Sequence, residues 1–203
     1  MLRVVGEPVA APIGVILAGG RGRRLGGDKA SVVVAGRSML EWSLASLRAV
    51  LEDVAVVAKG GSHLPPLPVD VALWVEPATT SHPLEGIAHA LRVADGRAVL
   101  VCAVDLPLVD AATVAALLTA RGGSVAVIAT TTGGAAPAAP QPLLGIYEPG
   151  ALSALAAAPP DSAVTEIVLG RLFPRLIAVA PEVLINVNRP EDIPLAEAHL
   201  MSR

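Results

Sequence analysis

The segment IGVILAGGRGRRLGGDK, residues 13–29, decides the expected fold, because it joins a strand pattern directly to a glycine-rich loop. Its apolar start predicts a short strand over Ile13–Leu17. The loop that follows carries five glycines and three arginines, and Lys29 stands at its end. Glycines let backbone N–H groups turn inward to bind anions, and added cations suit phosphate. The segment therefore predicts a strand that delivers a cationic, glycine-lined loop to one edge of a sheet.

The cations distinguish this loop from the common phosphate-binding motifs. It is not the GxxxxGK[ST] loop, since Lys29 is followed by Ala30, and it is a poor match to GxGxxG. The chain has only two lysines, and one of them ends this loop. A solvated surface turn is one alternative, and a clamp on a polyphosphate is the functional interpretation. Arg24 and Lys29 are the candidates for neutralising the phosphates, because they lie nearest the end that re-enters ordered structure.

Strand patterns alternate with helix patterns along the rest of the chain. Short apolar runs predict strands and apolar residues at helical spacing predict helices, with Ser38 and Asp110 as N-caps. The predicted strands cover residues 13–17, 53–58, 71–75, 98–104, 124–129, 143–147, 176–179 and 183–187, and the predicted helices cover residues 38–51, 84–94, 110–120, 149–157, 161–170 and 189–200. Residues 130–142 have the composition of a surface loop. The alternation predicts a three-layer α/β fold with a mostly parallel central sheet.

The composition fits one ordered domain. The 203 residues are 53% hydrophobic and 16% charged, so we expect a single domain over 1–203, with 1–12 as a flexible N-terminal segment. A net charge of −3 and four aromatic residues argue against a nucleic-acid or anionic-membrane binder. Because no signal-peptide pattern or membrane-length apolar run is found, we expect a cytoplasmic location.

The cysteine and the histidines do not predict a metal or nucleophile site. Cys102 is the single cysteine, which excludes an internal disulfide, and its apolar neighbours predict a buried core residue. The four histidines have no metal-ligand spacing with Cys102 or with each other. We therefore predict no zinc site.

Asp105 follows the most apolar predicted strand, residues 98–104. An isolated buried carboxylate is costly, so this residue needs a partner or water. It is either a turn aspartate or a ligand for Mg²⁺, which prefers oxygen donors. Ligands bind beyond the carboxyl ends of parallel strands, and both Asp105 and the loop of residues 18–29 fall at such ends. The two are therefore expected to share one site.

Asn186 and Asn188 lie in INVNRPEDI, residues 185–193. They alternate along a predicted strand, which would place both amides on one face. One amide oxygen could complete the metal site. The alternative is that both asparagines fix the entrance to the last helix.

Four motifs together resemble the MobA-like nucleotidyltransferases, the family of molybdenum cofactor guanylyltransferases. LAGGRGRRLGGDK (17–29) resembles the family signature LAGGxSxRMGxDK, and VCAVDLPLV (101–109) resembles its strand ending in CDxP. PLLGIYEPGALSAL (142–155) resembles its P-L-x-A-L-Y segment, and INVNRPEDI resembles its NINTPEDL. The matches occur in family order over nearly the whole chain.

The resemblance implies a Rossmann-like nucleotidyltransferase fold and a specific reaction. The family joins GMP from GTP to the phosphate of molybdopterin, releases pyrophosphate and requires Mg²⁺. Its partners would be GTP and molybdopterin or the molybdenum cofactor, with transient contact with other cofactor-biosynthesis proteins and no nucleic acid or membrane. Carried over by motif, the nucleotide would lie against Leu17, Ala18, Gly19 and Gly20, its phosphates against Lys29, Mg²⁺ against Asp105 and Asn188, and the acceptor against Asn186 and Asn188.

The segment before the second helix departs from the family pattern. Glu76 stands where the family commonly has aspartate, and the turn reads SHPLEG, residues 81–86. His82 replaces the expected first glycine, whereas Gly86 is retained. The family associates this region with guanine selection, so Glu76 and Gly86 are further candidates for nucleotide binding.

Three alternatives remain open at this stage. A transferase could use CTP, could act on another phosphorylated acceptor, or the chain could be a nucleotide-binding module without turnover. Relatives that use CTP usually show an LAAG start and a different aspartate segment, so the resemblance carried by LAGG and VCAVDLP implies guanine rather than cytosine. Retention of both Lys29 and Asp105 speaks against a module that only binds.

Overall fold

A central sheet with helices on both faces forms the body of the protein. The computed structural model describes residues 10–19, 25, 27–77, 82–131, 139–159 and 161–202. The strands are β1 (Ile13–Leu17), β2 (Val33–Val34), β3 (Arg37–Ser38), β4 (Val54–Lys59), β5 (Ala72–Glu76), β6 (Val99–Ala103), β7 (Ala126–Thr131), β8 (Pro140–Tyr147) and β9 (Arg175–Val179). The helices are α1 (Met39–Arg48), α2 (Pro83–Val93), α3 (Ala111–Thr119), α4 (Leu152–Ala156), α5 (Val164–Leu172) and α6 (Ile193–Met201), with 3₁₀ helices η2 (Lys29–Ser31), η3 (Pro149–Ala151), η4 (Pro181–Leu184) and η5 (Pro190–Asp192).

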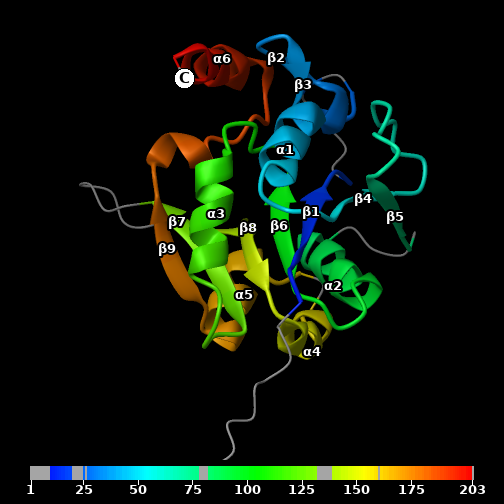
Figure 1. Ribbon diagram of the computed structural model, residues 1–203, viewed down its shortest axis with the longest axis vertical. Helices are drawn as coiled ribbons and strands as arrows, with labels where there is room; N and C mark the ends of the chain where they lie inside the picture. The colour runs from blue at the N-terminus through cyan, green and yellow to red at the C-terminus, as the bar shows by residue number, and fades with distance from the viewer. Residues whose placement is uncertain are drawn as a thin grey trace, which may run out of the picture.

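The main sheet of the described chain is mostly parallel, as predicted. Its strand order is β5-β4-β1-β6-β8-β7-β9 (Figure 1). β1 pairs in parallel with β4 and β6, β4 with β5, and β7 with β9. β8 is antiparallel to both of its neighbours, β6 and β7. The carboxyl ends of β1, β4, β5 and β6 therefore meet at one edge of the sheet.

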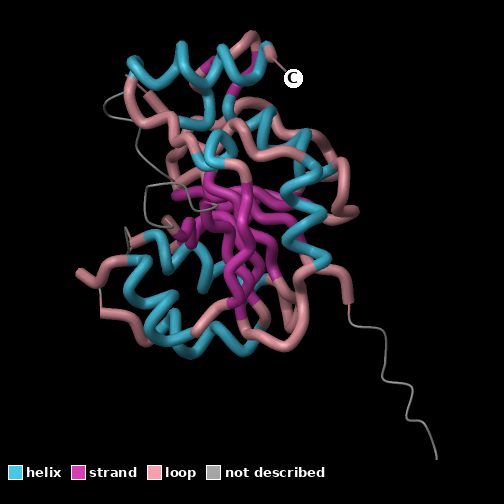
Figure 2. Tube along the Cα trace, turned by 90° about the vertical axis from the view of Figure 1, so that its left-hand side faces the viewer, coloured by secondary structure: helices cyan, strands magenta, loops and turns pink. Residues whose placement is uncertain are grey.

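Two apolar cores, one on each face of the sheet, produce the three layers (Figure 2). Along β1 the side chains alternate, so Ile16 joins the core beneath α1, α3 and α6, and Val15 joins the core beneath α2, α4 and α5. Both residues are fully buried. Burial of each such side chain contributes about 1.5–3 kcal/mol, so these packed faces hold the strand ends in place.

Local sequence signals account for the starts of α1 and α3. The Ser38 hydroxyl accepts from the backbone N–H of Glu41 at 3.2 Å, and the Glu41 carboxylate accepts from the backbone N–H of Ser38 at 2.7 Å. The Asp110 carboxylate accepts from the backbone N–H of Thr113 at 2.8 Å. Both predicted N-caps are therefore confirmed.

A short hairpin between the loop and α1 was not predicted from the sequence. β2 and β3 are antiparallel, and the turn between them places Ala35 and Gly36 at φ values of 48° and 79°. Two successive positive φ values match a type I′ turn, which usually carries Asn-Gly rather than Ala-Gly. The backbone N–H of Ala35 donates to Glu197 of α6 at 2.9 Å, so the hairpin is fastened to the C-terminal helix.

The predicted strand over residues 183–187 is wrong. This region begins as the 3₁₀ helix η4, with Pro181 in its first turn, and residues 185–188 belong to no strand. The backbone N–H of Val187 donates to the carbonyl of Asp105 at 2.9 Å, so it serves the loop after β6 rather than a strand ladder. Asn186 and Asn188 therefore do not alternate along a strand.

Other differences from the prediction concern boundaries. The helix predicted over 149–157 divides into η3 and α4, the last helix begins as η5, and α5 is shifted to later residues. β7 and β8 each extend into the predicted loop 130–142, of which residues 132–138 lie outside the described part, as do residues 1–9 of the N-terminal segment. No described helix is both long and apolar enough to cross a membrane.

Candidate active site

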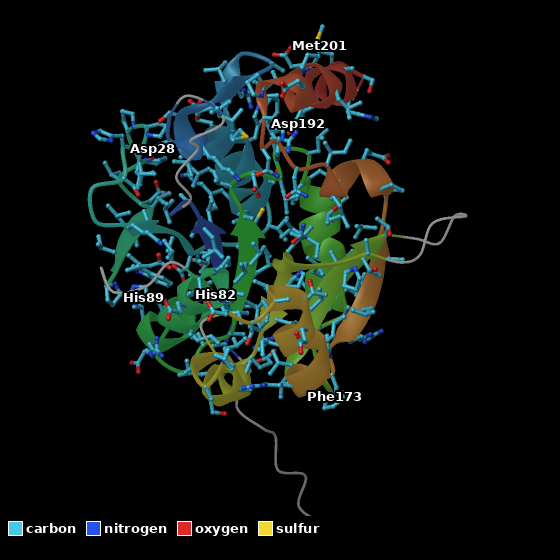
Figure 3. All side chains as sticks on the ribbon, turned by 180° about the vertical axis from the view of Figure 1, so that it is seen from behind. Asp28, His82, His89, Phe173, Asp192 and Met201 are labelled. Carbon is cyan, nitrogen blue, oxygen red and sulfur yellow. The ribbon has the colours of Figure 1, made fainter. Side chains whose placement is uncertain are left out.

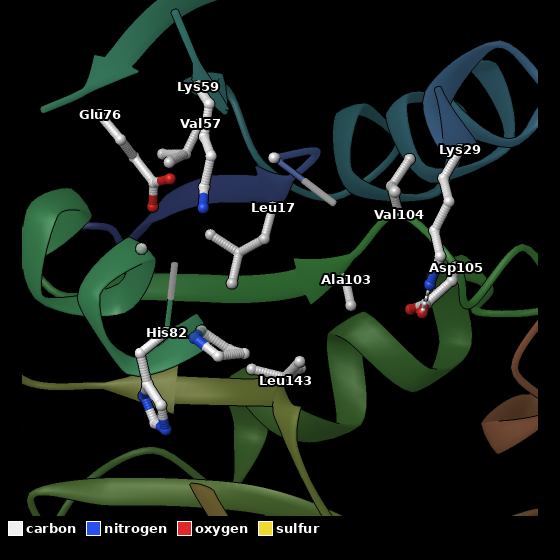
Figure 4. A pocket seen from close by; sticks show the side chains of 13 residues that line it. Leu17, Lys29, Val57, Lys59, Glu76, His82, Ala103, Val104, Asp105 and Leu143 are labelled. Atoms are coloured by element: carbon white, nitrogen blue, oxygen red, sulfur yellow. Dashed lines mark hydrogen bonds and ion pairs between the residues drawn. The ribbon is translucent and has the colours of Figure 1, made fainter. Parts of the chain in front are cut away.

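A cleft of about 190 Å³ lies at the carboxyl edge of the sheet, beyond β1, β4, β5 and β6 (Figure 4). Figure 4 shows Lys29 and Asp105 at one end of the cleft and Lys59 and Glu76 at the other. The lining residues are Leu17, Gly19, Lys29, Val57, Lys59, Glu76, His82, Pro83, Gly86, Ala103, Val104, Asp105 and Leu143. The cleft is therefore mostly apolar, with charged side chains concentrated at its two ends.

One end of the cleft is built around the ammonium group of Lys29, the first residue of η2. This group donates to Oδ2 of Asp105 at 2.8 Å and also to Oδ1 of Asn188. The side chains of Lys29 and Asp105 are 19% and 17% exposed, so the ion pair is largely shielded but open to the cleft. Three distant segments of the chain meet at this one cation.

The backbone around Asp105 and Asn188 holds both oxygens in place. The bond from the N–H of Val187 to the carbonyl of Asp105 joins the two segments. The carboxylate of Asp192 accepts from the N–H groups of Asn188 and Arg189, each at 2.8 Å. Figure 3 labels Asp192 close to α6, where this turn begins the last helix. The hydrogen bonds of this segment, residues 185–193, therefore fix the position of the Asn188 amide.

The same two oxygens suit a divalent cation. Asp105 Oδ2 and Asn188 Oδ1 already converge on a single positive charge, that of Lys29. Mg²⁺ takes hard oxygen ligands and is usually bound by one or two carboxylates together with substrate phosphates. Within the described residues, no group of three or more His, Cys, Asp or Glu side chains could hold a metal ion. The Asp105 and Asn188 pair therefore fits a metal that arrives with a phosphate ligand.

At the other end of the cleft, Glu76 lies against two glycines. A Cβ atom added to Gly86 would lie 2.8 Å from Glu76 Oε1, and one added to Gly19 would lie 3.3 Å from Oε2. Burial raises the pKa of Glu76, Lys59 lowers it and Glu85 raises it further. The missing side chains of Gly19 and Gly86 therefore make room for a carboxylate that is partly withdrawn from water.

His82 stands at the start of α2 (Figure 3), and each of its ring nitrogens lies within hydrogen-bond distance of a backbone group. Nδ1 accepts from the backbone N–H of Leu84 at 3.3 Å, and Nε2 lies 2.7 Å from the carbonyl of Ser162. A carbonyl only accepts and a backbone N–H only donates, so Nε2 carries the proton and Nδ1 does not. The ring is therefore held by backbone groups from two segments.

Comparison with known proteins identifies the family. The family described as "MobA-like NTP transferase domain" matches residues 14–175. The chain belongs to this family. It is 31% identical over 194 residues to the molybdenum cofactor guanylyltransferase of Cereibacter sphaeroides, covering 92% of this chain and 96% of that one. The MobA-like assignment and the prediction of a nucleotidyltransferase enzyme are thereby confirmed.

Solved structures of related fold support the same architecture. The molybdopterin-guanine dinucleotide biosynthesis protein A of Archaeoglobus fulgidus has a TM-score of 0.66 at 20% identity, covering 94% of this chain and 100% of that one. The 2-C-methyl-D-erythritol 4-phosphate cytidylyltransferase of Thermus thermophilus has a TM-score of 0.69 at 21% identity, with the same coverages. The predicted Rossmann-like nucleotidyltransferase fold is therefore confirmed, and it is a fold that a cytidylyltransferase also uses.

The MobA-like motifs place most of the predicted site residues on this cleft. Its lining includes the predicted residues Leu17, Gly19, Lys29, Glu76, Gly86 and Asp105. Ala18 is buried, and its N–H donates to the carbonyl of Val57 at 2.8 Å. Asn188 reaches Lys29, whereas the amide of Asn186 donates to the carbonyl of Leu184 at 3.1 Å. The predicted residues Gly20 and Arg24 lie outside the described residues.

Seven lining residues were not among the predicted site residues of this MobA-like chain, and Lys59, His82 and Leu143 are three of them. Lys59 ends β4, so the rule that ligands bind at carboxyl ends of strands could have found it. His82 was visible only as a departure from the family turn. Leu143 reaches the cleft from β8, the reversed strand, and although it lies in the matched segment 142–155, that motif did not mark it as a site residue.

Cys102 takes no part in the chemistry of the site. The residue is fully buried in β6, as predicted, and burial raises the pKa of its thiol to about 12. The thiolate required for nucleophilic attack is therefore strongly disfavoured.

Proposed function

We propose that this MobA-like enzyme transfers GMP from GTP to the phosphate of molybdopterin and releases pyrophosphate. The observation that carries the proposal is the meeting of Lys29, Asp105 and Asn188 at one end of a cleft whose other end holds Glu76. Each end carries one lysine and one carboxylate, and we assign the phosphates to the end where Asp105 and Asn188 can also hold a metal, and the base to the Glu76 end. The name of the Cereibacter sphaeroides relative supports guanylyl transfer to the molybdenum cofactor.

The reaction needs no protein nucleophile. An oxygen of the molybdopterin phosphate attacks the α-phosphorus of GTP, and a new P–O bond forms. The bond from the α-phosphorus to the bridging oxygen breaks, and pyrophosphate leaves with that electron pair. The protein contributes positioning and charge neutralisation, as in other phosphoryl-type transfers.

Each residue at the phosphate end has a separate part in this step. Lys29 neutralises the phosphates and the charge that develops on pyrophosphate. Asp105 and Asn188 would hold Mg²⁺, which when bound offsets phosphate charge. Because both oxygens now bind the ammonium of Lys29, that group would turn from them toward the phosphates. Arg24 is proposed as a second cation for the leaving group.

The carboxylate of Glu76 favours guanine on chemical grounds. An ionised carboxylate only accepts hydrogen bonds, and it has two oxygens side by side. Guanine offers two neighbouring donors, its N1–H and 2-amino groups, whereas adenine and cytosine pair one amino donor with a ring acceptor. Glu76 lies between Gly19 and Gly86 at the end of the cleft away from Lys29. A base bound there leaves its phosphates free to reach Lys29.

Pyrophosphate release tests the proposal directly. The protein is incubated with molybdopterin, Mg²⁺ and each of GTP, CTP, ATP and UTP, and pyrophosphate is measured over time. GTP should give the fastest release, and release should require molybdopterin. Equal or faster turnover with CTP would overturn the base assignment. Binding of nucleotide without turnover of any of the four would favour a non-catalytic module.

Gly86→Ala should weaken GTP binding without weakening the fold. The added Cβ would lie 2.8 Å from Glu76 Oε1 and 3.3 Å from Leu17 Cδ2, so the flexible carboxylate must move. Alanine is the better helix former by about 0.8–1.0 kcal/mol, which offsets the contact with Leu17. We expect roughly tenfold weaker GTP binding by calorimetry and an unchanged or higher urea midpoint. Gly170→Ala in α5, where an added Cβ meets nothing within 4 Å, is the matched control.

Glu76→Gln should stabilise the ligand-free protein at pH 7 and weaken GTP binding. The pKa of Glu76 is raised in the folded state, so the protonated carboxyl group stabilises the fold. This stabilisation is fully present below pH 4.5, the ordinary pKa of the group, and is lost as the pH rises through the folded-state pKa. The variant should gain less than about 1 kcal/mol at pH 7, since half the group is screened by water, and nothing at lower pH. Urea unfolding at both pH values measures this, with the exposed Glu52→Gln as control. A pH-independent difference would contradict the prediction.

A further inference from the structure

We propose that His82 is a positioning residue that ties the first turn of α2 to the segment before α5 and thereby fixes the Glu76 end of the cleft, formed by Gly19, Glu76 and Gly86. The proposal rests on the proposed role of this cleft in nucleotide binding. It concerns a position at which the family pattern has glycine, so the side chain is an addition made by this chain. None of the four motifs quoted above includes His82.

The stronger of the two His82 bonds joins separate segments. Nε2 donates to the carbonyl of Ser162 at 2.7 Å, whereas the bond from Leu84 N–H to Nδ1, within the same helix start, is 3.3 Å long. Ser162 lies two residues before α5, which is anchored in the core by Ile167 and Val168. The bond to Ser162 thus connects the start of α2 to the segment that leads into α5.

The position of α2 matters because Gly86 lies one helical turn after His82. Glu76 packs closely against Gly86, since a Cβ atom added to Gly86 would lie only 2.8 Å from Glu76 Oε1. A small shift of this helical turn would therefore change the space available to the carboxylate. His82 itself lines the cleft, but both of its nitrogens are already bonded to backbone groups. It therefore acts through Gly86 and Glu76 rather than by a hydrogen bond to the nucleotide.

Two substitutions separate the link to Ser162 from the cap on Leu84. In His82→Asn the amide occupies the place of Nδ1, caps the helix well and is too short to reach Ser162. In His82→Gln the amide N–H₂ occupies the place of Nε2 and can donate to Ser162, but glutamine is a poor N-cap. A residue that serves only as a helix cap would be replaced well by asparagine and badly by glutamine, which is the reverse of the proposal.

Ligand-free hydrogen exchange tests the link without any assumption about function. We expect His82→Asn to speed exchange of the amides in residues 84–87 and 162–165, and His82→Gln to leave them close to wild type. Arg121→Met, which breaks the ion pair with Glu148 at the opposite edge of the sheet, is the control for general destabilisation. Equal exchange in His82→Asn and wild type would overturn the proposal.

Calorimetry with Mg·GTP tests the consequence for the cleft. We expect His82→Asn to bind roughly tenfold more weakly than wild type, since small displacements of positioning groups are costly, with its melting temperature unchanged. His82→Gln should bind Mg·GTP with an affinity within about threefold of wild type. Its melting temperature should be a few degrees lower, because glutamine is a poor N-cap for α2. Wild-type affinity in His82→Asn, or equal losses in both variants, would overturn the proposal. Failure of the wild-type protein to bind GTP would instead refute the proposed function, and the exchange comparison would still decide the link.

Discussion

Asp105→Asn should lower the rate of pyrophosphate release by roughly 10³-fold or more, because it removes the charged oxygen at the phosphate end of the cleft. Asparagine keeps the size of the side chain, so the loop after β6 should be retained. The ion pair with Lys29 is largely shielded, so its loss should also lower stability, by about 1–3 kcal/mol. Steady-state kinetics and urea unfolding of the same preparation measure the two effects.

Asp53→Asn is the matched control for Asp105→Asn. The Asp53 carboxylate also forms an ion pair, with Arg97 at 2.7 Å, but at the start of β4, away from the cleft. Asp53→Asn should leave turnover within about twofold of wild type and cost no more than about 1 kcal/mol of stability, since this pair is the more exposed one. Near-normal turnover in Asp105→Asn would remove this residue from the catalytic machinery.

Lys29→Met should weaken GTP binding by roughly 10- to 100-fold, the range expected for losing a charge-assisted contact to phosphate. Methionine keeps most of the alkyl chain, so the change isolates the ammonium. Guanosine lacks phosphates and should bind the variant within about twofold of wild type. Calorimetric titration with GTP and with guanosine provides the comparison.

Equal losses for GTP and guanosine would contradict the phosphate role of Lys29. They would indicate instead that the variant disturbs the whole cleft, since Lys29 joins Asp105 to Asn188. Arg48→Met, which removes a cation from the surface ion pair with Asp70 outside the cleft lining, is the matched control. It should bind both ligands as wild type does.

The parts of the fold that depend on local signals could be predicted from the sequence. The apolar run before Asp105 forms β6, and Ser38 and Asp110 cap the helices that they precede. The rule that ligands bind at strand carboxyl ends brought Asp105 and Lys29 to one edge, where they form an ion pair. These results follow because hydrophobic spacing and capping act over a few residues.

The parts that depend on distant contacts could not be predicted. Lys29 and Asn188 are 159 positions apart, and nothing local to either shows that they meet. An apolar run also carries no direction, so the sequence did not show that β8 is reversed. The pattern of residues 183–187 resembled a strand, but the backbone N–H of Val187 donates to the carbonyl of Asp105, in the loop after β6, rather than to a neighbouring strand.

The late position of Ile185–Asn188 in the chain separates formation of the sheet from completion of the active site. β9, the last strand of the described sheet, ends at Val179, so a ribosome delivers every described strand before it delivers Asn188. A chain that stopped after Val179 would carry the strands, Lys29 and Asp105, but not the amide that completes their cation site. The phosphate end of the cleft can therefore be completed only after every described strand has been synthesised.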